Sequence, residues 1–251
     1  MGKLAMLWES VVHTMGKNQS CCAVIVAAGS GSRMGAGVNK QFLEIAGKPV
    51  LAYTLEAFDR AHTIRDVVIV AKSEEIVTVS DLVREFGIKK VRNIVAGGAV
   101  RQQSVYNGVM AAEGCTHVAI HDGARPFILP ETIDKVVQEA WKFGAAAVGV
   151  RVNDTVKRCD DKGIITETVD RSSLWAVQTP QVFDRAVILG AHQYVQQHGL
   201  KVTDDCMALE AMGGQVRMVE GQYSNRKMTT PEDLVYGEAI VAQRQMEGEE
   251  I

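Results

Sequence analysis

The sequence has no large excess of charge of either sign. Its 251 residues include 27 Lys and Arg against 30 Asp and Glu, which gives a formal net charge of −3. Proteins that bind nucleic acids or membrane surfaces mainly by electrostatic attraction carry a basic excess, so we expect no nucleic acid and no membrane as partner. Hydrophobic residues make up 47% and charged residues 23% of the chain, which excludes a disordered or fibrous protein.

Cysteines are few and are not arranged for zinc binding or disulfide pairing. The five of them form no Cys-x-x-Cys pair, and an odd number argues against a disulfide framework. This usage predicts a reducing compartment, and we expect a cytoplasmic protein. Residues 1–20 contain no arginine, and Glu9 interrupts their only apolar part. We therefore expect no signal or membrane span there, but a loose N-terminal extension outside the fold.

From Cys22 onward, short β-branched runs alternate with amphipathic segments, which is typical of parallel strands joined by crossover helices. Strands are predicted at 23–27, 67–70, 91–95, 118–121 and 145–150. Helices are predicted at 50–60, 74–86, 101–112, 131–143 and, with Thr230 as N-cap, up to about residue 246. The first strand is apolar on both faces and so belongs at the centre of the sheet. The fold class is α/β: a single Rossmann-like three-layer domain over 21–251, with a mostly parallel central sheet.

One interval, at about 153–182, departs from this alternation. Within it, 155–157 and 164–169 have strand character, and Asp160-Asp161-Lys162-Gly163 has the composition of a turn. The pattern predicts an inserted β-hairpin arm, which serves either as a lid or as a dimerisation element. No internal repeat or linker-like stretch supports a second domain.

A loop of small residues follows the first strand, in the string Ala27-Ala28-Gly29-Ser30-Gly31-Ser32-Arg33-Met34-Gly35. Ligands bind at the carboxyl ends of strands in open α/β sheets. Glycines allow backbone N–H groups to approach a phosphate, and Arg33 adds a fixed positive charge. Met34 occupies the place of the third glycine of a dinucleotide fingerprint, and the lysine of a Walker loop is missing. The loop therefore indicates an anionic ligand, the alternative being an ordinary strand–helix turn.

Three further features are predicted to reach the same sheet edge. Lys40 lies on the same connection, Gly97-Gly98 precedes the helix that contains Ser104, and Asp122 ends a strand. A helix N-terminus attracts phosphate, and a carboxylate near phosphates can hold Mg²⁺. Taken singly, these residues could be a solvated lysine, a helix cap and an ion-paired aspartate. Together they indicate phosphoryl or nucleotidyl transfer, which depends on positioning and cations more than on a nucleophilic side chain.

An ordered set of short motifs carries a resemblance to a known family. The set comprises Ala27-Ala28-Gly29-x-Gly31-x-Arg33-Met34, Lys40-Gln41, Gly97-Gly98 with Arg101 and Ser104, Asp122-Gly123-Ala124-Arg125-Pro126, Asp154-Thr155, Asp170-Arg171, Gln178-Thr179-Pro180-Gln181, Thr203-Asp204-Asp205 and Asn225-x-Lys227-x-Thr229. From Cys22 to about Tyr236, the chain resembles the 2-C-methyl-D-erythritol 4-phosphate cytidylyltransferase family. Asn39 departs from the pattern, because the family often has proline there.

The resemblance implies a homodimeric, Mg²⁺-dependent enzyme of non-mevalonate isoprenoid synthesis. Such an enzyme makes 4-diphosphocytidyl-2-C-methyl-D-erythritol and pyrophosphate from CTP and 2-C-methyl-D-erythritol 4-phosphate. Carried over to this chain, the catalytic cations are Arg33, Lys40 and Lys227, and Asp122 is the metal ligand. The hairpin becomes the dimer arm.

The remaining roles are carried over from the family in the same way. The residues expected to bind the nucleotide are Ala27, Ala28, Gly29, Ser30, Gly31, Gly97, Gly98, Ser104 and Asp122. Those expected to bind the second substrate are Asp122, Arg125, Thr155, Arg171, Thr179 and Thr203. Of these, Thr155 and Arg171 match positions that reach the neighbouring subunit's site.

Two other functions remain open at this stage. The first is a cytidylyltransferase for another polyol phosphate, such as ribitol 5-phosphate, which would share the CTP loop and the sheet. The Asp122–Arg125 and Trp175–Pro180 strings favour the methylerythritol enzyme. The second is a non-catalytic nucleotide-binding module, against which the retained cations and carboxylate argue. A dehydrogenase would require the missing glycine and a ribose-binding acid.

Overall fold

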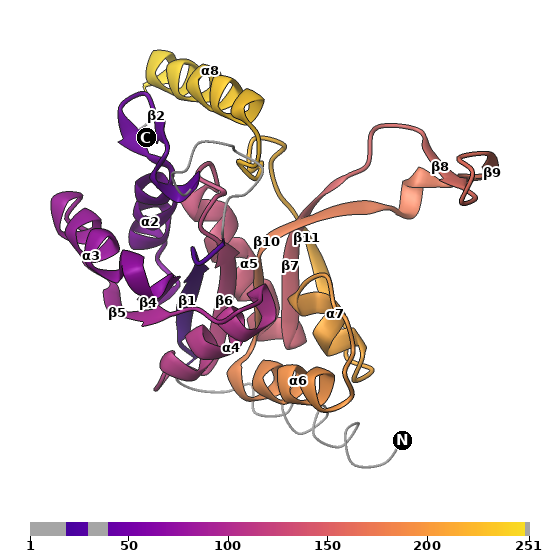
Figure 1. Cartoon of the computed structure of the whole chain (residues 1–251), viewed down its shortest axis with the longest axis horizontal. Helices are drawn as coiled ribbons and strands as arrows, with labels where there is room; N and C mark the ends of the chain where they lie inside the picture. Colours follow the sequence, from indigo (N-terminus) through magenta and orange to yellow (C-terminus); the bar gives the residue numbers. More distant parts are fainter. Residues whose placement is uncertain (1–18, 30–39, 249–251) are drawn as a thin grey trace.

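The computed structural model describes residues 19–29 and 40–248, and it has the predicted three-layer α/β architecture (Figure 1). Seven strands form the central sheet in the order β11-β7-β10-β6-β1-β4-β5. Their bounds are β1 Cys21–Val26, β4 Ile64–Ala71, β5 Val91–Ala96, β6 His117–Asp122, β7 Ala145–Arg151, β10 Trp175–Asp184 and β11 Arg217–Glu220. Only β10 runs antiparallel to its neighbours in this sheet. The predicted mostly parallel sheet is confirmed.

Helices cover both faces of this sheet. One face packs against α2 Val50–Arg60, α3 Ile76–Glu85 and α5 Pro130–Phe143. The other packs against α4 Arg101–Ala111, α6 Arg185–Gln197 and α7 Asp205–Glu210. A third apolar cluster joins α8, Pro231–Glu247, to the small hairpin formed by β2 Glu44–Ile45 and β3 Lys48–Pro49. The predicted helices are present, whereas α6, α7, β10, β11 and the small hairpin were not predicted.

Strand β1 lies at the centre, as its composition predicts. Ala23 and Ile25 point into the cluster beneath α2 and α5, whereas Cys22 and Val24 point into the cluster beneath α4 and α6. A strand covered on both faces needs apolar residues at every position, not at alternate ones. This explains why β1 has no polar side chain.

Helix α4 packs closely against the sheet because Gly108 faces it. A Cβ atom at this position would lie 2.4 Å from Cγ1 of Val24 and 2.6 Å from Cγ2 of Val70. Alanine is a better helix former than glycine, but here its methyl group would overfill a packed core. We expect Gly108→Ala to lower the free energy of unfolding by about 1–3 kcal/mol, measured by urea denaturation.

Gly190 in α6 provides the matched control, because a Cβ atom there would meet no atom within 4 Å. Gly190→Ala should instead raise the free energy of unfolding by about 0.5–1 kcal/mol, since only the backbone effect operates. Equal effects of the two substitutions would contradict the close approach of α4 to the sheet.

A two-stranded arm projects from the body of the molecule (Figure 1). It is formed by β8 Val156–Cys159 and β9 Ile165–Val169. The turn between them is held by Asp160, whose Oδ1 accepts hydrogen bonds from the backbone N–H groups of Lys162 and Ile164. The predicted interval 153–182 ends too late, because β10 begins at Trp175 and pairs with β6 and β7 in the central sheet.

The predicted N-terminal extension, 1–20, lies outside the described residues except for its last two. The backbone carbonyl of Ser20 accepts hydrogen bonds from the N–H groups of Thr116 and His117, so the fold already includes this residue. All five cysteines are free thiols. In the part of the chain that the structure describes, no helix is long and apolar enough to cross a lipid bilayer.

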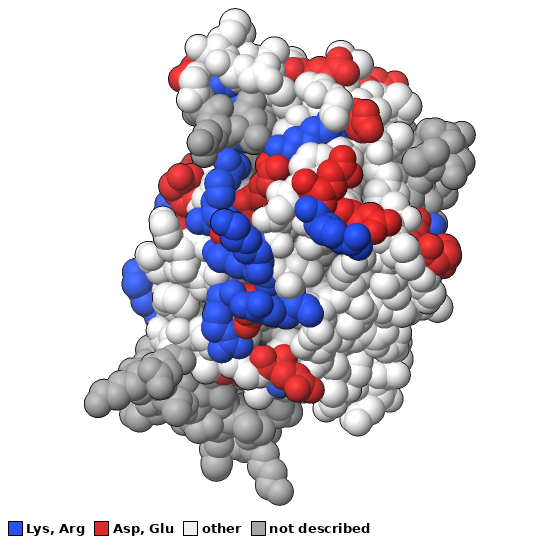
Figure 2. All heavy atoms as spheres, turned by 90° about the vertical axis from the view of Figure 1, so that its left-hand side faces the viewer, with Lys and Arg blue, Asp and Glu red and all other residues white. Residues whose placement is uncertain are grey.

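Charged residues of both signs share the surface shown in Figure 2, where a band of Lys and Arg side chains is interrupted and flanked by acidic ones. At the end of the sheet where β5 is the edge strand, Arg65 on β4 and Arg92 on β5 both pair with Asp66, at N–O distances of 2.6 and 2.9 Å. Asp66 therefore neutralises part of the positive charge of these two arginines.

Candidate active site

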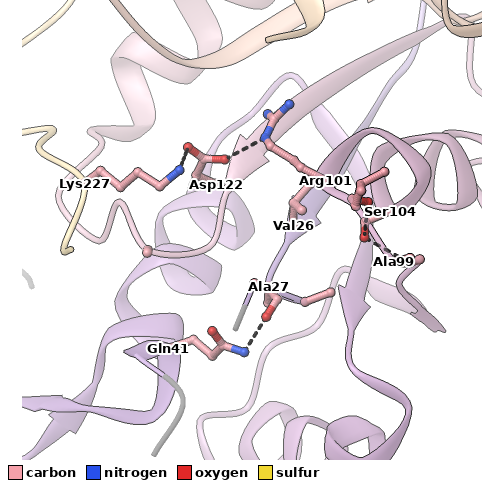
Figure 3. Close-up of a pocket in the computed structure, with 13 residues that line it drawn as sticks. Val26, Ala27, Gln41, Ala99, Arg101, Ser104, Asp122 and Lys227 are labelled. Atoms are coloured by element: carbon pink, nitrogen blue, oxygen red, sulfur yellow. Dashed lines mark hydrogen bonds and ion pairs between the residues drawn. The ribbon is translucent and has the colours of Figure 1, made fainter. Parts of the chain in front are cut away.

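The carboxyl ends of β1 and β6 lie side by side, and Val26 is paired with Asp122 in the sheet register. From β1 the chain continues to β4 on one side of this strand, and it reaches β6 on the other side only later. Such a reversal of strand order opens a crevice in which α/β proteins bind ligands. A pocket of about 290 Å³ lies there (Figure 3). It is lined by Val26, Ala27, Ala28, Gly29, Gln41, Gly98, Ala99, Val100, Arg101, Ser104, Asp122, Ala124 and Lys227.

The loop after β5 forms one wall of this pocket. The N–H of Gly98 donates to Oγ of Ser104 over 3.0 Å, and Ser104 Oγ lies 3.2 Å from the backbone carbonyl of Val100, to which it donates. At Gly97, a Cβ atom would lie 2.4 Å from Cβ of Ala28. Glycine at 97 therefore allows the loops after β5 and β1 to touch, and the predicted nucleotide-binding residues of these two loops are brought together.

Asp122 is the centre of the charged part of the pocket. Lys227 Nζ donates to its Oδ2 over 2.8 Å, and Arg101 Nε lies 3.4 Å from its Oδ1 (Figure 3). Arg125 Nε lies 3.7 Å from Oδ2. Burial by itself would raise the pKa of this carboxyl, but the charges of Arg101 and Lys227 outweigh it and hold the pKa below its ordinary value. Asp122 is thus a carboxylate at neutral pH.

Arg101 connects this carboxylate to a second one that the sequence did not single out. Its Nη2 donates to Oδ2 of Asp205, the first residue of α7, over 2.9 Å. Burial would lower the pKa of the guanidinium, but the charges of Asp205 and Asp122 raise it above its ordinary value. Although Arg101 belongs to the motif set and lines the pocket, it was not among the predicted site residues.

His121 holds the end of β6 in a defined orientation. Its Nε2 lies 3.2 Å from the backbone carbonyl of Arg125, and its Nδ1 lies 3.1 Å from Oγ1 of Thr179. A carbonyl only accepts, so Nε2 carries the proton and Nδ1 accepts from the threonine hydroxyl. Complete burial lowers the pKa of His121 to about 3, and the ring is therefore neutral near neutral pH.

The Thr179 hydroxyl is consequently occupied within the protein. It donates to His121 and accepts from the N–H of Asp122 over 3.1 Å. Thr179, a predicted substrate residue, is not among the residues that line the pocket, and its hydroxyl proton is already donated to His121. Its clearest contact is with the backbone of Asp122.

The segment that carries Lys227 is anchored by buried Asn225. Its Nδ2 donates to Oε1 of Gln178 and to the backbone carbonyl of Thr179, both over 2.9 Å. The backbone carbonyl of Asn225 accepts a hydrogen bond from Nη1 of Arg125 over 2.8 Å. These contacts explain the Asn225-x-Lys227 spacing, because the anchored asparagine places the lysine next to Asp122.

The other predicted residues lie elsewhere or outside the described parts. Ser30, Gly31 and Arg33 fall outside the described residues. Lys40 begins the 3-10 helix Lys40–Phe42, and its neighbour Gln41 donates from Nε2 to the carbonyl of Ala27.

Of the six predicted substrate residues, only Asp122 lines this pocket within one chain. Arg125 and Thr179 lie next to it, in contact with Asp122. Thr155 is exposed at the start of the arm, and Arg171 donates to the carbonyl of Asn153 at its base. Thr203 is exposed just before α7. Over residues 19–29 and 40–248, no group of three or more His, Cys, Asp or Glu side chains could hold a metal ion. Among the residues that line the pocket, the acidic one is Asp122.

Comparison with known proteins places this site in a family. The family model for 2-C-methyl-D-erythritol 4-phosphate cytidylyltransferase matches residues 21–243. A protein of that name from Clostridium botulinum (strain 657 / Type Ba4) is 46% identical over 228 residues, which cover 90% of this chain and 98% of the relative. Another, from Halalkalibacterium halodurans, is 47% identical over 222 residues, which cover 88% of this chain and 97% of the relative.

Solved structures agree. The crystal structure of 4-diphosphocytidyl-2C-methyl-D-erythritol synthase from Anaerococcus prevotii DSM 20548 superposes with a TM-score of 0.82 at 30% identity, covering 91% of this chain and 99% of that one. The corresponding cytidylyltransferase from Thermus thermophilus superposes with a TM-score of 0.72 at 30% identity, covering 89% of this chain and 100% of that one. The predicted family is confirmed: the chain belongs to the 2-C-methyl-D-erythritol 4-phosphate cytidylyltransferase family of nucleotidyltransferases.

Proposed function

We propose that the Asp122 pocket transfers the cytidylyl group of CTP to 2-C-methyl-D-erythritol 4-phosphate, in the synthesis of isoprenoid precursors. The products are 4-diphosphocytidyl-2-C-methyl-D-erythritol and pyrophosphate. The observation that carries the proposal is the arrangement around Asp122, where a carboxylate in contact with Lys227 and Arg101 lies beside two glycine-containing loops at a sheet edge. Nucleotidyl transfer needs this combination of backbone donors, cations and a carboxylate.

The reaction forms one P–O bond and breaks another. A phosphate oxygen of methylerythritol phosphate attacks the α-phosphorus of CTP, and the bond from this phosphorus to the bridging oxygen of the β-phosphate breaks. Because the attacking phosphate is already anionic near neutral pH, the site needs no general base. We assign to Arg33, Lys40 and Lys227 the stabilisation of negative charge on the reacting phosphates.

The loops account for recognition of the nucleotide. Residues 27–31 would cradle the triphosphate, and Gly97, Gly98 and Ser104 would contact the cytosine. Arg125 and Thr203 would contact the acceptor. For Thr179 we propose an indirect part, because its hydroxyl proton is donated to His121 and its oxygen holds the N–H of Asp122.

We further propose that the enzyme uses Mg²⁺. Mg²⁺ is commonly bound by one or two carboxylates together with substrate phosphates, not by an all-protein cage. The pocket fits this requirement, since it presents the Asp122 carboxylate at the predicted triphosphate site. Bound there, the ion would neutralise phosphate charge. In the protein alone, Lys227 and Arg101 provide the counter-charges of Asp122.

The arm supports a proposal of a homodimer. Ile164 and Ile165 near its tip are 63% and 58% exposed, which is unfavourable for a hairpin with no other cover. A second copy of the chain would bury them. Thr155 and Arg171 would then reach the neighbouring pocket from this arm. A single domain over 21–251 and a cytoplasmic location complete the proposal.

The proposed reaction is tested by pyrophosphate release from CTP and Mg²⁺, with methylerythritol 4-phosphate and ribitol 5-phosphate as parallel acceptors. Release with the methylerythritol substrate alone is the expected result. Preference for ribitol 5-phosphate would retain the CTP site but overturn the acceptor. The absence of pyrophosphate release with both acceptors would overturn the enzymatic function and favour a nucleotide-binding module.

A further inference from the structure

Behind the pocket lies a buried carboxylate that the proposed chemistry does not use. Asp205 is 1% exposed at the start of α7. Its Oδ2 accepts from Nη2 of Arg101 over 2.9 Å, and its Oδ1 lies 3.2 Å from Nε2 of His192 on α6, without good hydrogen-bond geometry. Burying a charge is costly unless it is paired. Asp205 therefore depends on Arg101 as the partner of its buried charge.

The guanidinium of Arg101 spans two carboxylates on different elements. Nε faces Oδ1 of Asp122 at 3.4 Å, at the end of β6, and Nη2 faces Asp205 at the start of α7. Among the described residues, its Nη1 makes no hydrogen bond. Since Arg101 lines the pocket (Figure 3), Nη1 is the nitrogen left to donate to a ligand.

The two carboxylates hold Arg101 unequally. The contact with Asp205 is short and buried, whereas that with Asp122 is at the long limit of a hydrogen bond. Without the Asp205 charge, Asp122 would be the remaining carboxylate for this guanidinium in the described part of the chain. A planar guanidinium pairs readily with one carboxylate through two parallel hydrogen bonds. In such a pair with Asp122, the Arg101 guanidinium would turn away from the ligand.

We propose that Asp205 is a positioning residue, which holds the Arg101 guanidinium off Asp122 so that its remaining N–H groups face the nucleotide phosphates. The proposal rests on the proposed function, because it requires that this pocket bind CTP. Asp205 touches neither substrate and acts only through Arg101. Its removal should therefore matter only while Arg101 is present.

A double-mutant cycle on CTP affinity tests this dependence, with binding measured by titration calorimetry in the presence of Mg²⁺ and without acceptor. We expect Asp205→Asn and Arg101→Met each to raise the CTP dissociation constant about tenfold, and Asp205→Asn to add less than about twofold in the Arg101→Met background. Glu210→Gln removes the same charge from the exposed end of α7 and should leave the affinity unchanged.

A full effect of Asp205→Asn in the Arg101→Met background would overturn the proposal, because Asp205 would then act without Arg101. Unchanged affinity in Arg101→Met would overturn it as well. If Asp205→Asn does not fold, Arg101→Lys keeps the charge but lacks the fork that spans both carboxylates, and it should still weaken CTP binding about tenfold. No CTP binding by the unsubstituted protein would overturn the proposed function itself.

Discussion

Asp122→Asn is expected to lower kcat/KM by about 10³-fold in the pyrophosphate-release assay, an effect comparable to the loss of a strong electrostatic group from an active site. The carboxylate contacts Lys227 at 2.8 Å and Arg101 at 3.4 Å, and it is the proposed ligand of Mg²⁺. Asparagine keeps the shape but removes the charge that pairs with Lys227 and that would hold the metal ion. Asp81→Asn, at an exposed pair with Arg84, should leave activity unchanged.

The same substitution should change how stability depends on pH. The pKa of Asp122 in the folded protein lies below its ordinary value, so its ionisation stabilises the fold at a pH above about 4, the value in an unfolded chain. This contribution is lost as the pH falls through the lowered pKa. The unsubstituted protein should therefore exceed Asp122→Asn in stability most at pH 7, and the difference should narrow at pH 3 in urea denaturation. A constant difference would mean that Asp122 carries no such charge interaction.

Arg33→Ala and Lys40→Ala are expected to lower kcat by about 10²–10³-fold each and to weaken cytidine binding far less. In the described part of the site, Arg101, Arg125 and Lys227 face the carboxylates of Asp122 and Asp205. The charges of these three cations and two carboxylates nearly cancel. A triphosphate and a phosphate monoester bring several negative charges, so further cations must compensate for them in the transition state.

The measurement is single-turnover kinetics at saturating CTP and methylerythritol phosphate, with cytidine affinity determined separately. Lys142→Ala provides the control, because this exposed lysine pairs with Glu139 on α5 and should leave kcat unchanged. Unaltered turnover in Arg33→Ala or Lys40→Ala would remove that residue from the proposed transition-state role. An equal loss of cytidine affinity would assign it to general nucleotide binding.

The parts of the fold that follow from local pattern were predictable. Helix α2 spans Val50–Arg60 as predicted, and β1 occupies the centre of the sheet because its residues are apolar on both faces. In contrast, β10 carries a motif at its start, Trp175–Pro180, and nothing in its local sequence indicates that it runs antiparallel between β6 and β7. Strand order of this kind depends on contacts between distant segments, which no local periodicity records.

The same division holds within the site. Asp122 and Lys227 were predicted from their motifs, and the structure places them 2.8 Å apart although 105 residues separate them. Asp205 was quoted only as part of a motif, and the sequence carries no sign that a residue 104 positions from Arg101 is its partner. The protonation of His121 likewise becomes clear only when the hydrogen-bond partners of both ring nitrogens are known.

The sequence by itself determined the alternation of strands and helices, the anionic nature of the ligand and the family, because these depend on residue type and spacing along the chain. The tertiary structure alone decided which charges share partners. The burial of Asp205 and the pairing of Arg101 with two carboxylates arise only when α4, β6 and α7 meet. Electrostatic energies depend on distance in space and on exclusion of water, and a linear sequence specifies neither.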